Sequence, residues 1–485
     1  MVYLIRKGGF CQYTWILDTL FKILKILDDH LVRKNMIRTR AAVKYLTVLL
    51  GGVFLTACSL TSAIAQYDNY SNYGSRAVGG VSIDQGMVKN ATKELKEGLK
   101  QEMLAKLQAI PSDLDQVVPE RKISLKKLDA TLKKCVDSKT AIPDSVRYLG
   151  GLTSVRYVIA VPEENDIILV GPAEGWTVND FGTIVGNKTG KPILILEDLI
   201  TVFRAWNTSH PELISCSIDP TPEGIARVNN ADLRNIRDPR AHAESIRELL
   251  GNQVVMLTGV PADSRYASVM VAADYRMKRI GLKLDPAPIS RFPSYLEMVK
   301  NPELYTAPRF WLAGEFRQIK HDAKKLTWDL GGVNVRTLTA REYFDQTGQS
   351  LGEIPVDTAA LRWANIMTKR YDELAAVDYS FAELRNCIDL AAVVALVYLE
   401  GLHIKSGCPL STILDAKSLK LPSYDVPKTV ATDFALVNVR NGQAIVGCGG
   451  IEVNPVPAIT QAKEDDTLKN VAKTANVSGE NWWCN

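Results

Sequence analysis

Residues 380–401 read SFAELRNCIDLAAVVALVYLEG, and this segment predicts the helix around which the rest of the chain packs. A capping box of Ser380 and Glu383 opens the predicted helix, and Gly401 is suited to end it. The run IDLAAVVALVYL, residues 388–399, is apolar all round. About 12 apolar residues are too few to cross a bilayer, so we expect a central core helix.

Strands and helices alternate in the chain before that helix. The apolar runs VRYVIAV (155–161) and IILV (167–170) predict two buried strands joined by a turn at PEEND. Alternation of this kind predicts a mixed α/β fold with at least some parallel strand pairing, followed by a helical region. The later members of the alternation are strands predicted at 213–218 and 254–260 and helices predicted at 242–250 and 264–280.

Polar caps and helical spacing predict further helices. Ser124 is placed to cap a short helix, and Thr221 is followed by the Pro and Glu that suit a first helical turn. Apolar residues at three- or four-residue steps predict a longer helix at 88–107, and another helix is predicted at 357–374.

The C-terminal region carries turn signals. Asn441-Gly442 predicts a β-hairpin between strands at 434–440 and 443–446, and the glycines of Gly447-Cys448-Gly449-Gly450 suggest a bulge or tight bend after it. A terminal cysteine beside Trp482 and Trp483 suggests that the chain end is pinned to the body.

The length of 485 residues predicts two or three globular domains behind an N-terminal leader. The predicted divisions are a gene-model extension or long n-region at 1–35, a signal peptide at 36–66, a linker at 67–78, α/β domains at 79–237 and 238–350, a helical core with a C-terminal hairpin at 351–460, and a polar tail at 461–485.

The signal-like segment 36–66 carries basic residues in front of an apolar run at 45–57. Three outcomes are open. Ordinary cleavage would follow Ala65, lipidation would occur on Cys58 in the lipobox-like LTAC, or 45–65 would remain as a membrane anchor. Each of them predicts export to the periplasm or cell envelope, with possible membrane attachment through the N-terminus.

The net charge of +4 comes from the leader. Residues 1–66 contain nine Lys and Arg against three Asp and Glu, so the remaining chain has a net charge of −2. Binding to nucleic acid calls for a surplus of basic residues, and we therefore expect no nucleic-acid partner.

Six cysteines remain after the leader, and an oxidising compartment would favour disulfides among them. Their pairing is open, because six cysteines allow about 15 combinations. No C-x-x-C or clustered Cys/His pattern is present, so we expect no metal site and no cofactor. The disulfide candidates are Cys135, Cys216, Cys387, Cys408, Cys448 and Cys484.

Motifs for catalysis are weak, and no catalytic residue is assigned. Ser124-x-x-Lys127 with a later Lys188-Thr189-Gly190 lacks the middle element of the serine acyltransferases, and Ser124 is better explained as a helix cap. Cys387 and His403 are separated by about 24 Å along one predicted helix, which is too far for a nucleophile and its base.

Two charged groups admit alternative interpretations. Arg276, Arg279 and Lys283 lie at helical spacing and favour a solvated face over an anion-binding stripe, with Asp274 and Lys278 a routine i,i+4 pair. Four carboxylates on neighbouring turns could form a glycosidase pair but are also ordinary turn residues. They are Glu163, Glu164, Asp166 and Glu174.

Five strings between residues 77 and 402 resemble a family of exported planctomycete proteins known as domain of unknown function 1598. The family has no established activity, so the resemblance implies an exported envelope location and no catalytic residue. The strings are GGVSID (79–84), NDIILVGPAEGW (165–176), CSIDPTPEG (216–224), VAADYRMKR (271–279) and RNCIDLA (385–391).

Taken together, these features predict an exported cell-envelope protein with a binding or structural role and an unidentified envelope partner. The alternative is a secreted hydrolase acting on wall polysaccharide or peptide. Two carboxyl groups about 5 to 10 Å apart in a deep groove would favour the hydrolase.

Overall fold

The helix predicted at 380–401 lies at the centre of the observed fold. The computed structural model describes residues 77–485 except 79–80, 85–86, 90–96, 234–237, 300–306, 345–349, 355–357, 438–442, 474–476 and 478. In it, α13 (Tyr379–Leu399) is buried along almost its whole length. Among the described residues, no helix has both the length and the apolar character that crossing a membrane requires.

The predicted capping box of α13 is wrong. Tyr379 is already helical, and Asp378 is the N-cap residue, because its carboxylate accepts a hydrogen bond from the amide of Ser380. Gly401, at φ 61°, follows the helix in the left-handed conformation that the sequence predicted for its end.

The N-terminal predictions fall mainly on residues that the structure does not describe. These include the signal segment 36–66 with Cys58 and Ala65, the preceding residues 1–35, and most of the linker 67–78. Contacts group Tyr67–Asn485 into one unit. The end of the predicted linker, Ala77–Val78, forms strand β1, so that part of the linker is structured.

A first seven-stranded sheet joins segments from all three predicted globular domains. Strand pairing is antiparallel except between β11 and β19, which are parallel. Strands β9 and β10, which flank the helices of the predicted alternation, pair antiparallel. In spatial order the strands are β15 (Ser350–Ile354), β14 (Val333–Phe344), β11 (Ala307–Phe316), β19 (Cys448–Val453), β9 (Ile214–Asp219), β10 (Gln253–Thr258) and β16 (Thr429–Val430).

A second seven-stranded sheet contains the apolar hairpin predicted at 155–170. Its two strands are buried along most of their length, as expected. The parallel pair here is β12 with β20. In spatial order the strands are β20 (Lys463–Glu464), β12 (Lys320–His321), β13 (Thr327–Asp329), β5 (Tyr157–Val161), β6 (Asp166–Ala173), β4 (Val118–Ser124) and β21 (Trp483–Cys484).

Three small antiparallel sheets and a set of helices complete the described part of the fold. The small sheets are β1 with β2 (Val81–Asp84) and β3 (Met87–Lys89), β7 (Trp176–Val178) with β8 (Ile184–Gly186), and β17 (Phe434–Val437) with β18 (Gln443–Val446). The helices are α3 (Glu97–Lys106), α4 (Leu125–Ser138), α5 (Asp144–Arg147), α6 (Leu196–Ser209), α7 (Pro222–Asn230), α8 (Pro239–Leu250), α9 (Arg265–Gly281), α10 (Tyr295–Met298), α11 (Thr358–Lys369), α12 (Tyr371–Val377), α14 (Leu402–Ser406), α15 (Ser411–Leu414), α16 (Val456–Thr460) and α17 (Leu468–Lys473), with short 3-10 helices at Leu149–Gly151 and Pro162–Glu164.

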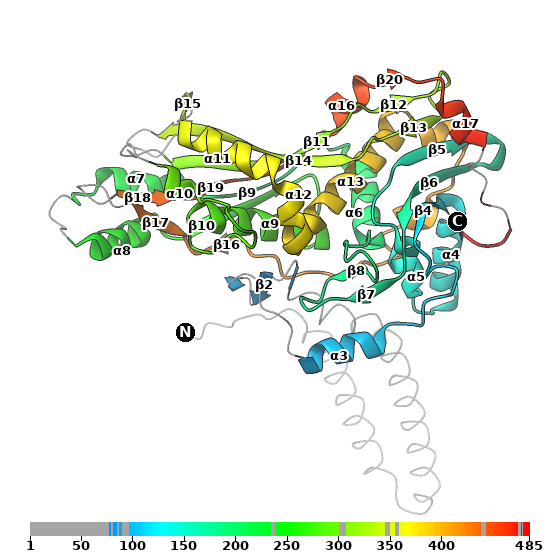
Figure 1. Cartoon of the computed structure of the whole chain (residues 1–485), viewed down its shortest axis with the longest axis horizontal. Coiled ribbons are helices and arrows are strands. Elements are labelled where there is room, and N and C mark those ends of the chain that lie inside the picture. The colour runs from blue at the N-terminus through cyan, green and yellow to red at the C-terminus, as the bar shows by residue number, and fades with distance from the viewer. Residues whose placement is uncertain are drawn as a thin grey trace, which may run out of the picture. The chain divides into compact units, whose positions relative to one another are not determined.

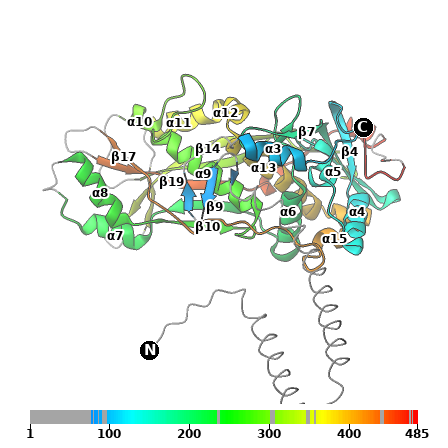
Figure 2. The ribbon, with the colours of Figure 1, turned by 90° about the horizontal axis from the view of Figure 1, so that it is seen from below.

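Three helices connect the two large sheets. In both views α13 and α6 lie between the first and the second sheet (Figures 1 and 2). Helix α9 packs against β9, β19 and β11 of the first sheet, and it also contacts α13 and α6. One core cluster includes residues from both large sheets and from these helices, so the fold class is mixed α/β, as predicted.

Local signals located several elements correctly. Ser124 caps α4, whose Leu125, Leu128 and Leu132 are buried, and Thr221 caps α7. The strands on both sides of the predicted hairpin pair antiparallel, although its Asn441-Gly442 turn lies outside the described residues.

Two predicted helices differ from the structure. Part of the helix predicted at 88–107 is strand, since Val88 belongs to β3, and α3 begins only at Glu97. The helix predicted at 357–374 is divided at Arg370 into α11 and α12. Apolar spacing alone did not show the break.

The glycines after the hairpin are required by close backbone packing. A Cβ atom on Gly449, at φ 131°, would lie 1.6 Å from the carbonyl oxygen of Phe310 in β11. A Cβ atom on Gly450 would lie 1.9 Å from the carbonyl oxygen of Cys216 in β9. Glycine therefore allows β19 to lie between these two strands.

The C-terminal segment is pinned to the body, as the sequence suggested. Strand β21 forms the edge of the second sheet and pairs with β4, and the buried Arg121 of β4 donates from Nε to the side chain of Asn485 over 2.8 Å. Its other guanidinium hydrogens are directed to the backbone carbonyls of Asp113, Leu114, Gln116 and Gly150. Burial lowers the pKa of Arg121 to about 10, so it stays protonated near neutral pH.

Replacing Arg121 is expected to loosen this end of the molecule. We expect Arg121→Met to lower the free energy of unfolding by about 2 to 3 kcal/mol, because buried carbonyl acceptors would lose their donors. Urea unfolding followed by circular dichroism measures the effect. The matched control is Arg362→Met on the exposed face of α11, expected to change stability by less than about 0.5 kcal/mol. Equal effects of the two substitutions would contradict this role of Arg121.

Candidate functional site

Helix α9 carries four basic side chains into or along the interior. Ser264 caps its first turn by accepting a hydrogen bond from the amide of Ala267 over 3.1 Å, which fixes the start predicted from the sequence. Nearly all of its residues are buried. Buried cations require anionic partners, so the partners of these bases define the electrostatics of the centre.

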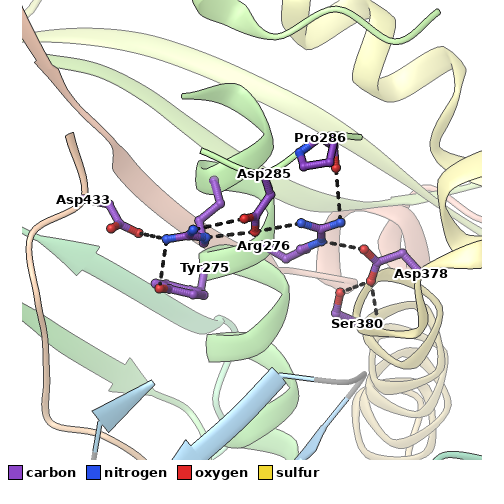
Figure 3. A network of polar contacts seen from close by, with 8 residues as sticks. Tyr275, Arg276, Asp285, Pro286, Asp378, Ser380 and Asp433 are labelled. Atoms are coloured by element: carbon purple, nitrogen blue, oxygen red, sulfur yellow. Dashed lines mark hydrogen bonds and ion pairs between the residues drawn. The ribbon is translucent and has the colours of Figure 1, made fainter. Parts of the chain in front are cut away.

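A first network surrounds the C-terminal half of α9 (Figure 3). Arg276 donates from Nε to Asp378 over 2.7 Å and from Nη1 to Asp285 over 2.9 Å. Arg279 donates from Nε to the same Asp285 over 2.8 Å, and its Nη1 lies 3.2 Å from Asp433. Because Asp378 also caps α13, the network ties α9 to that helix and to two loops.

The solvated face predicted for this part of α9 is wrong. The side chain of Arg276 is 5 % exposed and that of Arg279 is 14 % exposed. Lys283, beyond the helix, is exposed and pairs with Glu297 over 2.7 Å. The two guanidinium groups are already bound to carboxylates, which also argues against an anion-binding stripe.

Charge interactions outweigh burial at the shared carboxylate. Burial alone would raise the pKa of Asp285, but the hydrogen bonds and charges of Arg279 and Arg276 lower it below its usual value. Burial raises the pKa of Asp433, with Arg279 opposing the shift. Hydrogen bonding to Asp285 raises the pKa of Arg279. Asp285 and Arg279 are therefore held as an ion pair at neutral pH.

A second pair faces the first sheet. Lys278 donates to Asp274 over 2.9 Å and to the carbonyl oxygen of Ile218 in β9 over 2.6 Å. The i,i+4 pair predicted from the sequence is present, and both of its side chains are almost fully buried. Burial raises the pKa of Asp274 to about 6, with Lys278 opposing the shift. Beside Lys278, a hollow lined by Phe310 and Trp363 has room for about one water molecule.

A third network lies at the N-terminal end of α9. Arg265 bridges two carboxylates, with Nη1 directed to Asp198 of α6 and Nη2 directed to Glu383 of α13. Glu197, the neighbour of Asp198, accepts a hydrogen bond from the hydroxyl of Tyr424 over 3.1 Å. The three carboxylates therefore come from two helices, and two of them, Asp198 and Glu383, share one guanidinium group.

This acidic cluster is poorly solvated. The side chains of Asp198 and Glu383 are 2 % and 6 % exposed. Burial raises the pKa of Asp198, and burial together with the charge of Asp198 raises the pKa of Glu197 to about 8. Glu197 thus carries a proton at neutral pH. The cluster can therefore hold and release a proton at Glu197.

The predicted disulfides require correction. The six cysteines after the leader are thiols, and the described residues form no disulfide. Five of the six are buried, where a thiol packs as a small apolar group. Burial raises the pKa of Cys216 and Cys387 well above the usual value and that of Cys408 to about 12, so these three thiols are poor nucleophiles.

The carboxylates considered for a glycosidase pair have separate surroundings. Asp166 is buried and accepts hydrogen bonds from the hydroxyl of Ser124 and the amide of Lys126. Glu174 is buried and accepts from the amides of Lys188 and Thr189. Glu163 and Glu164 are exposed on the turn of the 3-10 helix between β5 and β6. Within the described chain, no group of His, Cys, Asp and Glu side chains is arranged to hold a metal ion.

Sequence reasoning missed the cluster around Arg265. Arg265 is more than 60 residues away from both Asp198 and Glu383 in the chain, and no local spacing joins it to them. The one available signal was the pair Glu197-Asp198 at the start of a predicted helix, where acidic residues are also common as partners of the helix dipole.

Comparison with known proteins finds a similarity for one stretch of the chain. A family model described as "Protein of unknown function (DUF1598)" matches residues 216–295, from β9 to the start of α10, and this stretch contains all of α9. Comparisons with curated proteins and with solved structures returned no match. Residues 216–295 are therefore similar to a domain of unknown function, and this matched stretch includes the charged helix α9.

Proposed function

We propose that this protein is exported to the cell envelope and has a binding or structural role there. The N-terminal sequence supports export, because the basic residues Arg38, Arg40 and Lys44 precede an apolar run of signal-peptide length. Cleavage after Ala65, acylation of Cys58 or retention as an anchor would each leave the body outside the inner membrane. The resemblance to exported planctomycete proteins supports the same location.

The observation that carries the proposed binding or structural role is the set of ion pairs made by the basic side chains of α9. Each of its four bases is ion-paired, and the carboxylates come from α6, α13, α9 itself and the loops at 285 and 433. A helix whose charged groups are used to join elements suits a rigid scaffold that presents its outer surface to a partner.

The hydrolase alternative has less support. Its candidate carboxylates Asp166 and Glu174 are held by backbone amides and hydroxyl groups, as expected for residues that order turns. The acidic cluster around Arg265 is enclosed by helices, whereas glycosidic bond cleavage needs two carboxyl groups on opposite sides of a substrate.

Export is tested by expressing the full chain in a bacterium and separating cytoplasm, periplasm and membranes. We expect the body in the periplasmic or membrane fraction. Intact-mass measurement should show a mature N-terminus at Gln66, a diacylated Cys58, or an uncleaved membrane-bound chain. Soluble full-length protein in the cytoplasm, with the same result after Leu49→Arg in the apolar run, would contradict export.

The role in the envelope is tested with purified cell-wall sacculi and envelope membranes. Protein that sediments with one of these materials without releasing soluble sugar or peptide fragments would support binding. Release of such fragments by the native protein at a higher rate than by heat-inactivated protein would favour the hydrolase. Failure to sediment with any envelope fraction, together with no release, would contradict both roles.

A further inference from the structure

The cluster around Arg265 contains more acid than its one base can neutralise. Asp198 and Glu383 both bind the guanidinium group, and Glu197 lies next to Asp198 in the first turn of α6. The Oε1 atom of Glu197 and the Oδ1 atom of Asp198 are shielded from solvent and have no hydrogen-bond partner among the described residues. If all three carboxyl groups were ionised, the cluster would hold a net charge of −2 away from water, which is costly.

Titratable and charged groups from several neighbouring elements lie near Glu197. Helix α15 packs on α6 but carries no titratable side chain, and α5 contributes Arg147, whose charge opposes the rise in the pKa of Glu197. The titratable and charged groups that face the cluster are Asp198 from α6, Arg265 from α9, Glu383 and Cys387 from α13, Arg147 from α5 and Tyr424 from the segment after α15.

Tyr424 belongs to residues 415–428, a segment without regular secondary structure that runs from α15 to β16 (Figure 2). We call this segment the strap. Its anchors near α9 are the amide of Tyr424, which donates to the carbonyl oxygen of Asp263 over 2.7 Å, and the hydroxyl of Ser423, which donates to the Asp263 carboxylate over 3.0 Å. Arg204 of α6 binds the carbonyl oxygen of Leu419. The side chain of Tyr424 is buried and reaches Glu197.

We propose that Glu197 and the acidic cluster around Arg265 form a proton-dependent latch, which holds the strap closed while Glu197 is protonated and weakens it when Glu197 ionises. In the closed strap Tyr424 lies against Glu197, whose Oε1 atom is shielded from solvent. Opening the strap returns Glu197 to water, where it ionises readily. The inference concerns the body alone and does not depend on export or on an envelope partner.

The direction of the pH effect follows from linkage. The pKa of Glu197 is about 8 in the closed state, compared with an ordinary value of 4.5. Opening therefore releases a proton at any pH between these two values, so the strap is most stable near the lower value and weakens as pH rises. Above the folded pKa the proton has already left the closed state, and the effect of pH levels off.

Hydrogen exchange of the full chain, measured by mass spectrometry, tests the latch. After division by the intrinsic exchange rate, strap amides should open up to about tenfold more per pH unit between about pH 5.5 and pH 7.5, and level off above about pH 8. In Glu197→Gln, which keeps the shape and removes the titration, the strap should open to an extent independent of pH. The matched control is Glu163→Gln on an exposed turn, which should retain the wild-type slope.

A second variant reports on the strap independently. Tyr424→Phe keeps the ring and removes the hydroxyl that binds Glu197, so strap amides should lose about three- to tenfold in protection near pH 5.5 while α13 amides stay protected. Three results would overturn the latch. These are an equal pH slope in wild type and Glu197→Gln, a parallel loss of protection in strap and α13 amides, and unchanged strap protection in Tyr424→Phe.

Discussion

Gly449→Ala is expected to prevent folding or to lower the free energy of unfolding by more than about 4 kcal/mol. The added methyl group would lie 1.6 Å from the carbonyl oxygen of Phe310, which belongs to the backbone of the neighbouring strand. Strand β19 is paired on both sides, with β11 and with β9, and cannot move away from one without leaving the other. The φ of 131° adds strain for any residue with a side chain.

A second glycine separates the effect of the steric clash from the effect of backbone strain. Gly190 also has a positive φ, of 70°, but a Cβ atom there would meet nothing within 4 Å. Gly190→Ala should therefore lower the free energy of unfolding by only about 1 to 2 kcal/mol, because it introduces left-handed backbone strain without a clash. Thermal and urea unfolding of the two variants measures the difference. A cost at Gly449 equal to that at Gly190 would show that β19 does not lie tightly between β11 and β9.

Arg265→Met is expected to lower the free energy of unfolding by about 3 to 5 kcal/mol at neutral pH. Methionine fills a similar volume but leaves Asp198 and Glu383 buried without their shared cation. The loss should be smaller at acidic pH, because burial already raises the pKa of Asp198 and protonation would remove its charge. Urea unfolding at several pH values measures both the size and the direction of the effect.

An exposed pair serves as the control for this substitution. Arg156 lies 3.7 Å from Asp329 with its side chain 59 % exposed, so Arg156→Met should cost less than about 1 kcal/mol. Adding Asp198→Asn and Glu383→Gln to Arg265→Met removes the unpaired charges and should recover part of the loss. No recovery in this triple variant would mean that Arg265 contributes through packing and not through charge.

Elements with local signals were predictable from the sequence. The caps at Ser124, Thr221 and Ser264 depend on a side chain that bonds an amide two or three residues later, which a short window of sequence contains. The buried helix α13 follows from its apolar composition, and the β5–β6 pair follows from two apolar runs around a turn.

Long-range pairing could not be predicted in the same way. The sequence did not show that β19 lies between β11 and β9, because the three strands come from distant parts of the chain. The same pairing joins segments that had been divided among three predicted domains. The long strands β11 and β14 were not predicted at all, although β14 carries alternating residue types.

The charged residues of α9 show a similar limit. Arg276 and Arg279 were predicted to be solvated because basic residues are mostly exposed. Their partners Asp378 and Asp433 are more than 100 residues away, so burial depended on tertiary contacts. The disulfide prediction rested on an inferred compartment and not on positions in the fold, which is why it found no support in the positions of the cysteines.

Whether α9 holds the body together is tested most directly by a double-mutant cycle on Arg276 and Asp378. Arg276→Met removes the cation, and Asp378→Asn removes the charge while keeping a side chain that can cap α13. Unfolding free energies of wild type, both single variants and the double variant give the coupling. A coupling above about 1 kcal/mol is predicted for a buried pair in direct contact. Additive costs within about 0.5 kcal/mol would contradict a cross-linking role for α9.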